Sequence, residues 1–159
     1  MKLRAKIIDR EMIIYLMKVL ASMAKMAKNL VFKFTETHVT ILADAKHIVD
    51  GQLTIWAQLT VNQYFQEYKF NGVCTENNWI VFEVEADKLQ KLVHSFQGDS
   101  NQLVIKLKRS STGPTVRFTL YYPSNQKDRD IINDMGIRVI HRSEWDHFAE
   151  PDVAHFDVS

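Results

Sequence analysis

The stretch MIIYLMKVLASMAKMA, residues 12–27, decides the fold class because its apolar residues recur with the period of an amphipathic helix. At 100° per residue, one face gathers the apolar residues Leu16, Leu20, Met23 and Ala27, flanked by Met12, Ile13, Val19 and Ala24. The opposite face carries the polar residues Glu11, Lys18, Ser22 and Lys25. Asp9 precedes the helix as a candidate N-cap, and Asn29 is expected to end it because asparagine tolerates the left-handed cap conformation.

Short segments with alternating apolar residues surround this helix and predict β-strands. The predicted strands cover residues 2–8, 30–35, 38–43, 53–59, 64–70, 79–84, 103–108, 115–122 and 131–140. Turn signals separate them, among them Asp50-Gly51, Asn71-Gly72, Asn77-Asn78 and Thr112-Gly113-Pro114. A second helix is predicted over residues 86–97, with an apolar face formed by Leu89, Leu92, Val93 and Phe96.

The order of these elements is a weak internal repeat of architecture. The first repeat consists of one strand, one helix and three strands. A short strand follows it, and then a second repeat with the same order of elements. The pattern predicts an α+β domain in which two helices pack on one face of a curved antiparallel sheet.

Length and composition allow one domain, or one domain with a short extension, in 159 residues. The chain has 20 Lys and Arg against 19 Asp and Glu, so its net charge of +1 gives no argument for nucleic-acid binding. Cys74 is the single cysteine, which excludes an intrachain disulfide or a thiolate zinc site and suits a reducing compartment. Neither a signal peptide nor a membrane span is expected.

The position of the charges is more informative than their total. Residues 12–35 contain no Asp or Glu but include Lys18, Lys25 and Lys28. On the second helix Lys91 and His94 again lie opposite the apolar face. If both helices cover one sheet face, these side chains share one surface, which suits sequence-independent contact with phosphates. An ordinary solvated helix face remains the other interpretation.

Other side chains were weighed as sites and given structural interpretations. Trp56, Trp79 and Phe82 are expected in the core rather than as a base-stacking platform, because they occupy alternating strand positions. Cys74 is expected to be an inert thiol, and Lys106 and Lys108 to form a solvated strand face. Two sets of residues could be drawn as metal clusters but match no zinc signature: Asp44, His47 and Asp50, and His141, His147 and His155. The sequence has no phosphate-binding glycine loop and no GxSxG motif.

Several segments, in order along the whole chain, resemble the Hus-type subunit of the nine-one-one checkpoint clamp. They are residues 1–7 (MKLRAKI), 23–28 (MAKMAK), 55–59 (IWAQL), 65–68 (FQEY), 72–73 with 76–78, and 137–140 (IRVI) with Arg142, Trp145 and Glu150-Pro151. No single segment is specific, and the resemblance depends on their co-linear sum.

The resemblance implies a PCNA-like clamp domain over residues 1–140, with residues 141–159 as a linker and the start of a second domain that this chain lacks. It implies a heterotrimer with Rad-type sister subunits that encircles double-stranded DNA. The further partners implied are a clamp loader, checkpoint factors and repair factors. No association with a membrane is implied. The implied location is the nucleus, with the cytoplasm as a second location.

The same resemblance implies a scaffold without enzymatic activity or cofactor. Lys25 and Lys28 match basic positions of the family that face DNA, and Lys91 and His94 fall where it places basic residues on the second helix. Lys18 is added to this set because it lies opposite the apolar face of the first predicted helix. An imidazole is a weaker match than lysine at neutral pH.

Two other functions stay open. A single domain could be an interaction module or regulator that binds sister subunits without encircling DNA. A metal hydrolase that uses the histidines would require bound metal, which we do not expect.

Overall fold

The computed structural model describes residues 1–43, 55–72, 75–76, 78–96, 98–123 and 130–148, with side chains as far as Trp145. Its strands are β1 (Lys2–Ile7), β2 (Asn29–Phe34), β3 (His38–Ala43), β4 (Trp56–Thr60), β5 (Glu67–Asn71), β6 (Ile80–Glu85), β7 (Gln102–Ser110), β8 (Gly113–Tyr121), β9 (Ile131–Gly136) and β10 (Arg138–Val139). Its helices are α1 (Arg10–Ala24), α2 (Val61–Tyr64), α3 (Ala86–Ser95) and the 3-10 helix η3 (Arg142–Phe148). The α+β class predicted from the sequence is confirmed.

The strands form two antiparallel sheets, ordered β5-β1-β7-β8-β9 and β10-β6-β2-β3-β4. The predicted repeat is present, but the first strand of each repeat joins the sheet of the other repeat. Strand β1 pairs with β7, and β6 pairs with β2. The curved sheet expected from the sequence is therefore built as two interlocked sheets.

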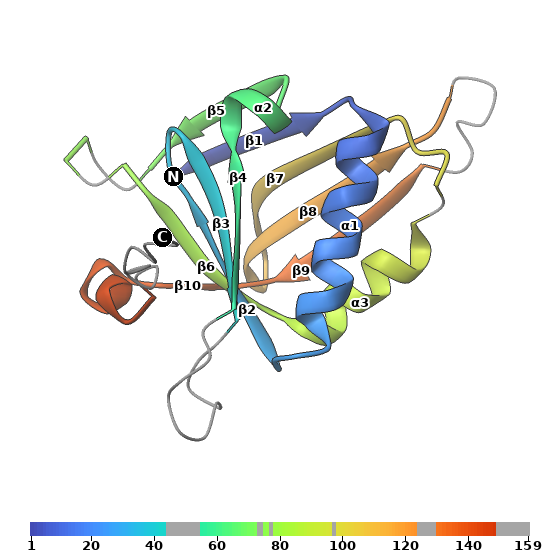
Figure 1. Ribbon diagram of the computed structural model, residues 1–159. Helices are drawn as coiled ribbons and strands as arrows, with labels where there is room; N and C mark the ends of the chain where they lie inside the picture. The colour runs from blue at the N-terminus through green and yellow to red at the C-terminus, as the bar shows by residue number, and fades with distance from the viewer. Residues whose placement is uncertain (44–54, 73–74, 77, 97, 124–129, 149–159) are drawn as a thin grey trace, which may run out of the picture.

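One hydrophobic core lies between the two sheets and the two longer helices. Figure 1 shows α1 and α3 next to each other on one side of the molecule, and the two helices are in contact. Phe82 lies at the centre of this core, with its ring centroid 5.5 Å from that of Phe32 and 5.6 Å from that of Phe34. Five residues of α1 are buried in this core: Ile13, Leu16, Met17, Leu20 and Met23. The predicted apolar faces of both helices are confirmed.

The start of α1 agrees with the sequence, whereas its end does not. Asp9 caps the helix, since its Oδ1 accepts a hydrogen bond from the Glu11 amide at 2.9 Å. The helix ends at Ala24, with Lys25 as a right-handed C-cap. The predicted continuation to residue 27 and the cap at Asn29 are wrong, because Asn29 is already paired with Glu85 in the sheet.

Two predicted strands are divided in the structure. Within the segment 64–70, Tyr64 ends the short helix α2, and the strand itself begins at Glu67. The segment 131–140 contributes β9 to one sheet and β10 to the other. The break is at Ile137, whose amide donates to the Pro114 carbonyl at 3.2 Å.

The interpretation of both tryptophans as core residues is wrong, although Phe82 is fully buried as predicted. Trp56 is 37% exposed and Trp79 is 38% exposed. The ring centroids of Trp79 and Trp145 lie 5.2 Å apart. The Nζ of Lys33 lies 4.0 Å from the centroid of the Trp79 ring. Trp145 is buried in a small cluster with Val31, Leu42, Val81 and Ile140, outside the main core.

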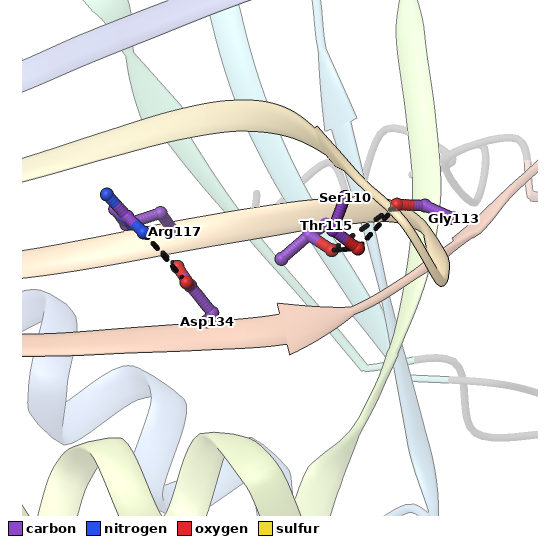
Figure 2. A network of polar contacts seen from close by, with 5 residues as sticks. All are labelled: Ser110, Gly113, Thr115, Arg117 and Asp134. Atoms are coloured by element: carbon purple, nitrogen blue, oxygen red, sulfur yellow. Dashed lines mark hydrogen bonds and ion pairs between the residues drawn. The ribbon is translucent and has the colours of Figure 1, made fainter.

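Strand β9 is an edge strand held by an ion pair to its neighbour. The Arg117 guanidinium on β8 donates to both carboxylate oxygens of Asp134 on β9, at 2.7 and 2.9 Å (Figure 2). At the other end of the β7–β8 hairpin, the Ser110 hydroxyl donates to the Gly113 carbonyl at 3.1 Å (Figure 2). Gly113 adopts a φ of 126°, which explains why glycine is suited to this predicted turn.

Replacing Phe82 with alanine should destabilise the domain strongly, because the change removes a ring that stacks on two others in the buried core. We expect a loss of about 3–5 kcal/mol in the free energy of unfolding, measured by urea denaturation. The control is Ile8→Ala, at a side chain that is 51% exposed, for which a change within about 0.5 kcal/mol is expected. Similar losses in both variants would contradict the central place of Phe82.

The Asp134→Asn variant should lose a small, pH-dependent part of the stability. The hydrogen bonds and charge of Arg117 hold the pKa of the Asp134 carboxyl below its usual value. A lowered native pKa stabilises the folded state above the unfolded pKa of about 3.9, and this contribution disappears as the pH falls through the lower native value. The difference in unfolding free energy between the two proteins should be at most about 1 kcal/mol near pH 7, because both side chains are partly exposed. A difference that stays constant down to acidic pH would contradict this assignment.

Candidate nucleic-acid interface

The lysines predicted to face DNA are exposed in the structure, and two of them gather where the two long helices meet. Lys25 and Lys28 lie directly after α1, rather than on the helix itself as predicted. The Lys28 carbonyl accepts a hydrogen bond from the amide of Ala86, the first residue of α3, at 2.8 Å. The end of α1 and the start of α3 are thereby fixed to each other, and both lysines stand at that junction.

The ends of both helix dipoles meet at this junction. The C-terminus of a helix carries a partial negative charge from its unpaired carbonyls, and Lys25 and Lys28 follow that end of α1. At the end of α1, the Ala24 carbonyl accepts a hydrogen bond from the Gln90 side chain of α3 at 3.2 Å. The positive end of the α3 dipole lies at the same junction, together with Glu85 and Asp87.

Lys18 occupies a different place on α1. It is exposed seven residues before Lys25, which corresponds to about 10 Å along the helix axis. It lines a shallow hollow of about 300 Å³ together with residues of α1 and of the edge strand β4 and its approach: Val19, Ser22, Met23, Ile55, Trp56 and Ala57. Lys18 therefore belongs to the border between helix and sheet edge, and the structure does not bring it to the junction with Lys25 and Lys28.

On α3 the predicted side chains are exposed but are not surrounded by cations alone. Lys91 and His94 are both exposed, and His94 lies in the last turn. Lys88 is half-exposed and forms an ion pair with Glu85 at 3.8 Å, while Asp87 is exposed in the first turn. Acidic residues therefore offset the positive charge near the start of this helix, and the cations predominate toward its end.

We call the exposed side chains Lys18, Lys25, Lys28, Lys91 and His94 the helix face. They lie on α1, on α3 or directly after α1, and the two helices are in contact on one side of the molecule (Figure 1). Lysines on an open surface suit loose contact with a phosphate backbone, since each is a mobile point charge with no fixed geometry. What these five side chains offer a partner is positive charge.

A second group of cations was only partly recognised in the sequence. Lys106 and Lys108 were interpreted as a solvated strand face, but their neighbours across the sheet were not identified. Arg4 lies opposite Lys106 on one side, and Arg117 lies opposite it on the other. The alternation of residues 2–7 contained a signal for this group, but the pairing of distant strands could not be read from the sequence.

The other site candidates lie largely outside the described residues. This holds for Cys74 and for the possible metal cluster of Asp44, His47 and Asp50. In the second possible cluster only the side chain of His141 is described. Among the described side chains, no group of three or more His, Cys, Asp or Glu is placed to hold a metal ion.

The described part of the chain also contains no helix that is both long and apolar enough to span a membrane. The longest described helix, α1, has 15 residues and carries Lys18 near its middle.

Comparison with known proteins connects this fold with a family. A family model described as Hus1-like protein matches residues 1–159. The chain is 27% identical to checkpoint protein HUS1 of Homo sapiens over 159 residues, which are all of this chain and 56% of that protein. It is 23% identical to checkpoint protein Hus1-like of Drosophila melanogaster over 161 residues, again covering all of this chain and 58% of that protein. The chain thus spans somewhat more than half the length of these relatives. Because the family model matches from end to end, the chain belongs to the Hus1-like protein family.

Proposed function

We propose that this chain acts as a subunit of a heterotrimeric checkpoint sliding clamp, with the helix face turned toward double-stranded DNA. The observation that carries the proposal is the junction of α1 and α3, where Lys25 and Lys28 stand exposed beside the first residue of α3. The name checkpoint protein, given to both relatives, supports a checkpoint role. In this role the protein is a scaffold without catalysis, located in the nucleus.

The mechanism we propose is electrostatic and independent of DNA sequence. Lysine ammonium groups on the helix face approach phosphates and displace counterions, which gives affinity that falls steeply as salt rises. They form few directional contacts, so the DNA can move past them while it remains held. Residues 12–35 contain no acidic residue, so the opposing charge near Lys28 comes from Glu85 and Asp87 at the start of α3.

Partner subunits are proposed to bind along the edges of the two sheets. Strands β5 and β9 form the edges of one sheet, and β10 and β4 form those of the other. An edge strand presents unpaired amides and carbonyls that can pair with a strand of another chain. Rad-type sister subunits are the proposed occupants. A clamp loader and checkpoint and repair factors would then act on the assembled clamp.

We retain residues 1–140 as the proposed clamp domain and residues 141–159 as a proposed connection. The described start of that connection is not detached from the domain. Trp145 in η3 is buried, and its indole Nε1 donates to the Ile140 carbonyl at 3.0 Å. This contact would fix the direction in which the chain leaves the sheet.

Charge reversal at the helix junction should weaken DNA binding without unfolding the protein. We expect the Lys25→Glu/Lys28→Glu variant to bind a short DNA duplex roughly tenfold more weakly at low salt, with a salt slope reduced by about 2. Fluorescence anisotropy across a salt series measures both quantities, and circular dichroism checks the fold. The matched control, Lys25→Arg/Lys28→Arg, keeps the charge and should retain binding. Unchanged affinity in the reversed variant would remove the helix face from the proposal.

The unpaired sheet edges also support a second candidate function, a regulator that binds sister subunits without holding DNA. Size-exclusion chromatography of the chain mixed with each sister subunit, with and without duplex, distinguishes the two functions. A clamp subunit should form a complex that retains DNA. Complexes that form with a sister subunit but never retain DNA would favour the regulator.

A further inference from the structure

The outer face of the sheet β5-β1-β7-β8-β9 carries a dense array of cations. In β1 the residues Leu3, Ala5 and Ile7 point into the main core, so the alternate residues of the strand point outward. The same alternation holds along β5, β7 and β8. The outward cations are Lys2, Arg4, Lys6, Lys69, Lys106, Lys108 and Arg117.

The strand register places four of these cations in one row across the sheet. Lys69 lies opposite Arg4, Arg4 lies opposite Lys106, and Lys106 lies opposite Arg117. Neighbouring strands are about 4.8 Å apart, so the row extends over roughly 14 Å. Like charges in directly opposed positions destabilise a sheet, and here three consecutive pairs have that arrangement. The stability of the fold does not explain such a row.

Two carboxylates lie within the array and are shared among its cations. Glu67 lies 3.3 Å from Arg4 and 3.4 Å from Lys69. Partial desolvation raises the pKa of the Glu67 carboxyl, but Lys69, Arg4 and Lys6 together hold it below its ordinary value. Asp134, at the end of the row, is bound to Arg117. These carboxylates engage both arginines, whereas Lys106, in the middle of the row, forms no ion pair with any described residue.

The array is accessible and is separate from the helix face. The Lys69 side chain is 76% exposed and that of Arg4 is 41% exposed. Helices α1 and α3 lie on the core side of this sheet, as Figure 1 shows. The outer face of the other sheet is different in kind, because its apolar residues Val31, Leu42 and Val81 pack with Trp145. A cationic face on one sheet thus stands beside an apolar face that packs with η3 on the other.

We propose that this outer cationic face is a second DNA-binding surface, which holds the phosphate backbone independently of the helix face. A row of about 14 Å is long enough to reach more than one phosphate of a DNA strand, whose charges recur about every 3.4 Å along the helix axis. Five of the seven cations are lysines, which suit phosphate contact that ignores sequence. The proposal goes beyond the proposed clamp function and does not require it.

An acidic protein segment is the competing partner, and the structure favours it less. Acidic and phosphorylated peptides are recognised by arginine clusters, because the guanidinium fork matches a carboxylate or a phosphate. Here both arginines already bind carboxylates of this chain. Single-stranded DNA is also less favoured, since stacking requires exposed aromatic rings and the exposed Trp56 and Trp79 do not belong to this sheet.

The test is the Lys106→Glu variant, which places an acid between Arg4 and Arg117. Relief of the like-charge pairs should raise the midpoint of thermal unfolding by about 1–4 °C. At the same time, affinity for a short mixed-sequence duplex should fall roughly threefold to tenfold at low salt, with a salt slope lower by about 1. A protein that becomes more stable while it binds DNA less well cannot have lost binding by unfolding. Lys106→Arg, which keeps the charge, should bind like the parent chain.

The same substitution in the Lys25→Glu/Lys28→Glu background separates this proposal from the proposed function. If both surfaces bind DNA, the binding that remains after reversal of the helix junction should fall again on addition of Lys106→Glu. If Lys106→Glu leaves affinity and salt slope unchanged in both backgrounds, the second surface is refuted while the helix face stands. Tighter binding to polyglutamate than to duplex, lost in Lys106→Glu, would also overturn the proposal in favour of an acidic protein partner.

Discussion

The exchange of first strands between the two halves of the chain is the constraint on which the rest of the structure depends. Strand β6 opens the second repeat yet pairs along its length with β2 of the first, and β1 pairs with β7 in the same manner. Each sheet therefore contains strands of both repeats. The phenylalanine rings of β2 and β6 stack on each other where the two repeats pair. Helix α1 must lead from one sheet to the other, and α3 must lead back. The two helices consequently meet on one side of the core, which is what creates a helix face.

This arrangement leaves the two sheets with outer faces that cannot belong to the core. Their chemistry diverges, since one packs apolar residues with Trp145 while the other displays cations. The chain has 20 basic and 19 acidic residues, so a concentration of cations on one face implies that most acidic residues lie elsewhere. The near-neutral net charge therefore does not reveal this cationic face. A protein of this composition can present strongly positive surfaces without being basic, and the position of each charge follows from strand alternation.

Local sequence patterns predicted single helices and strands, but they failed where the structure depends on contacts between residues far apart in the sequence. The period of residues 12–27 and the alternation of residues 2–8 were sufficient for α1, β1 and the α+β class, although the helix ends before Lys25 and Lys28. The position of Trp79 outside the main core was missed because its ring packs against Trp145, 66 positions further along the chain. The division of the segment at Ile137 was missed because the alternation of more and less exposed residues continues across the break, and only the partner strands differ. The row through Lys106 was missed for the same reason, since register is a property of pairs of strands.

The two cationic surfaces differ in how the fold keeps them positive. At the end of α1, Lys25 and Lys28 follow the negative end of the helix dipole, which favours cations. On the sheet, the cations oppose one another and only part of that cost is offset by Glu67 and Asp134. A helix layer and the core lie between the two surfaces, so the surfaces share no contacts. Substitutions on one surface should therefore add to substitutions on the other, because distant sites without shared partners act independently.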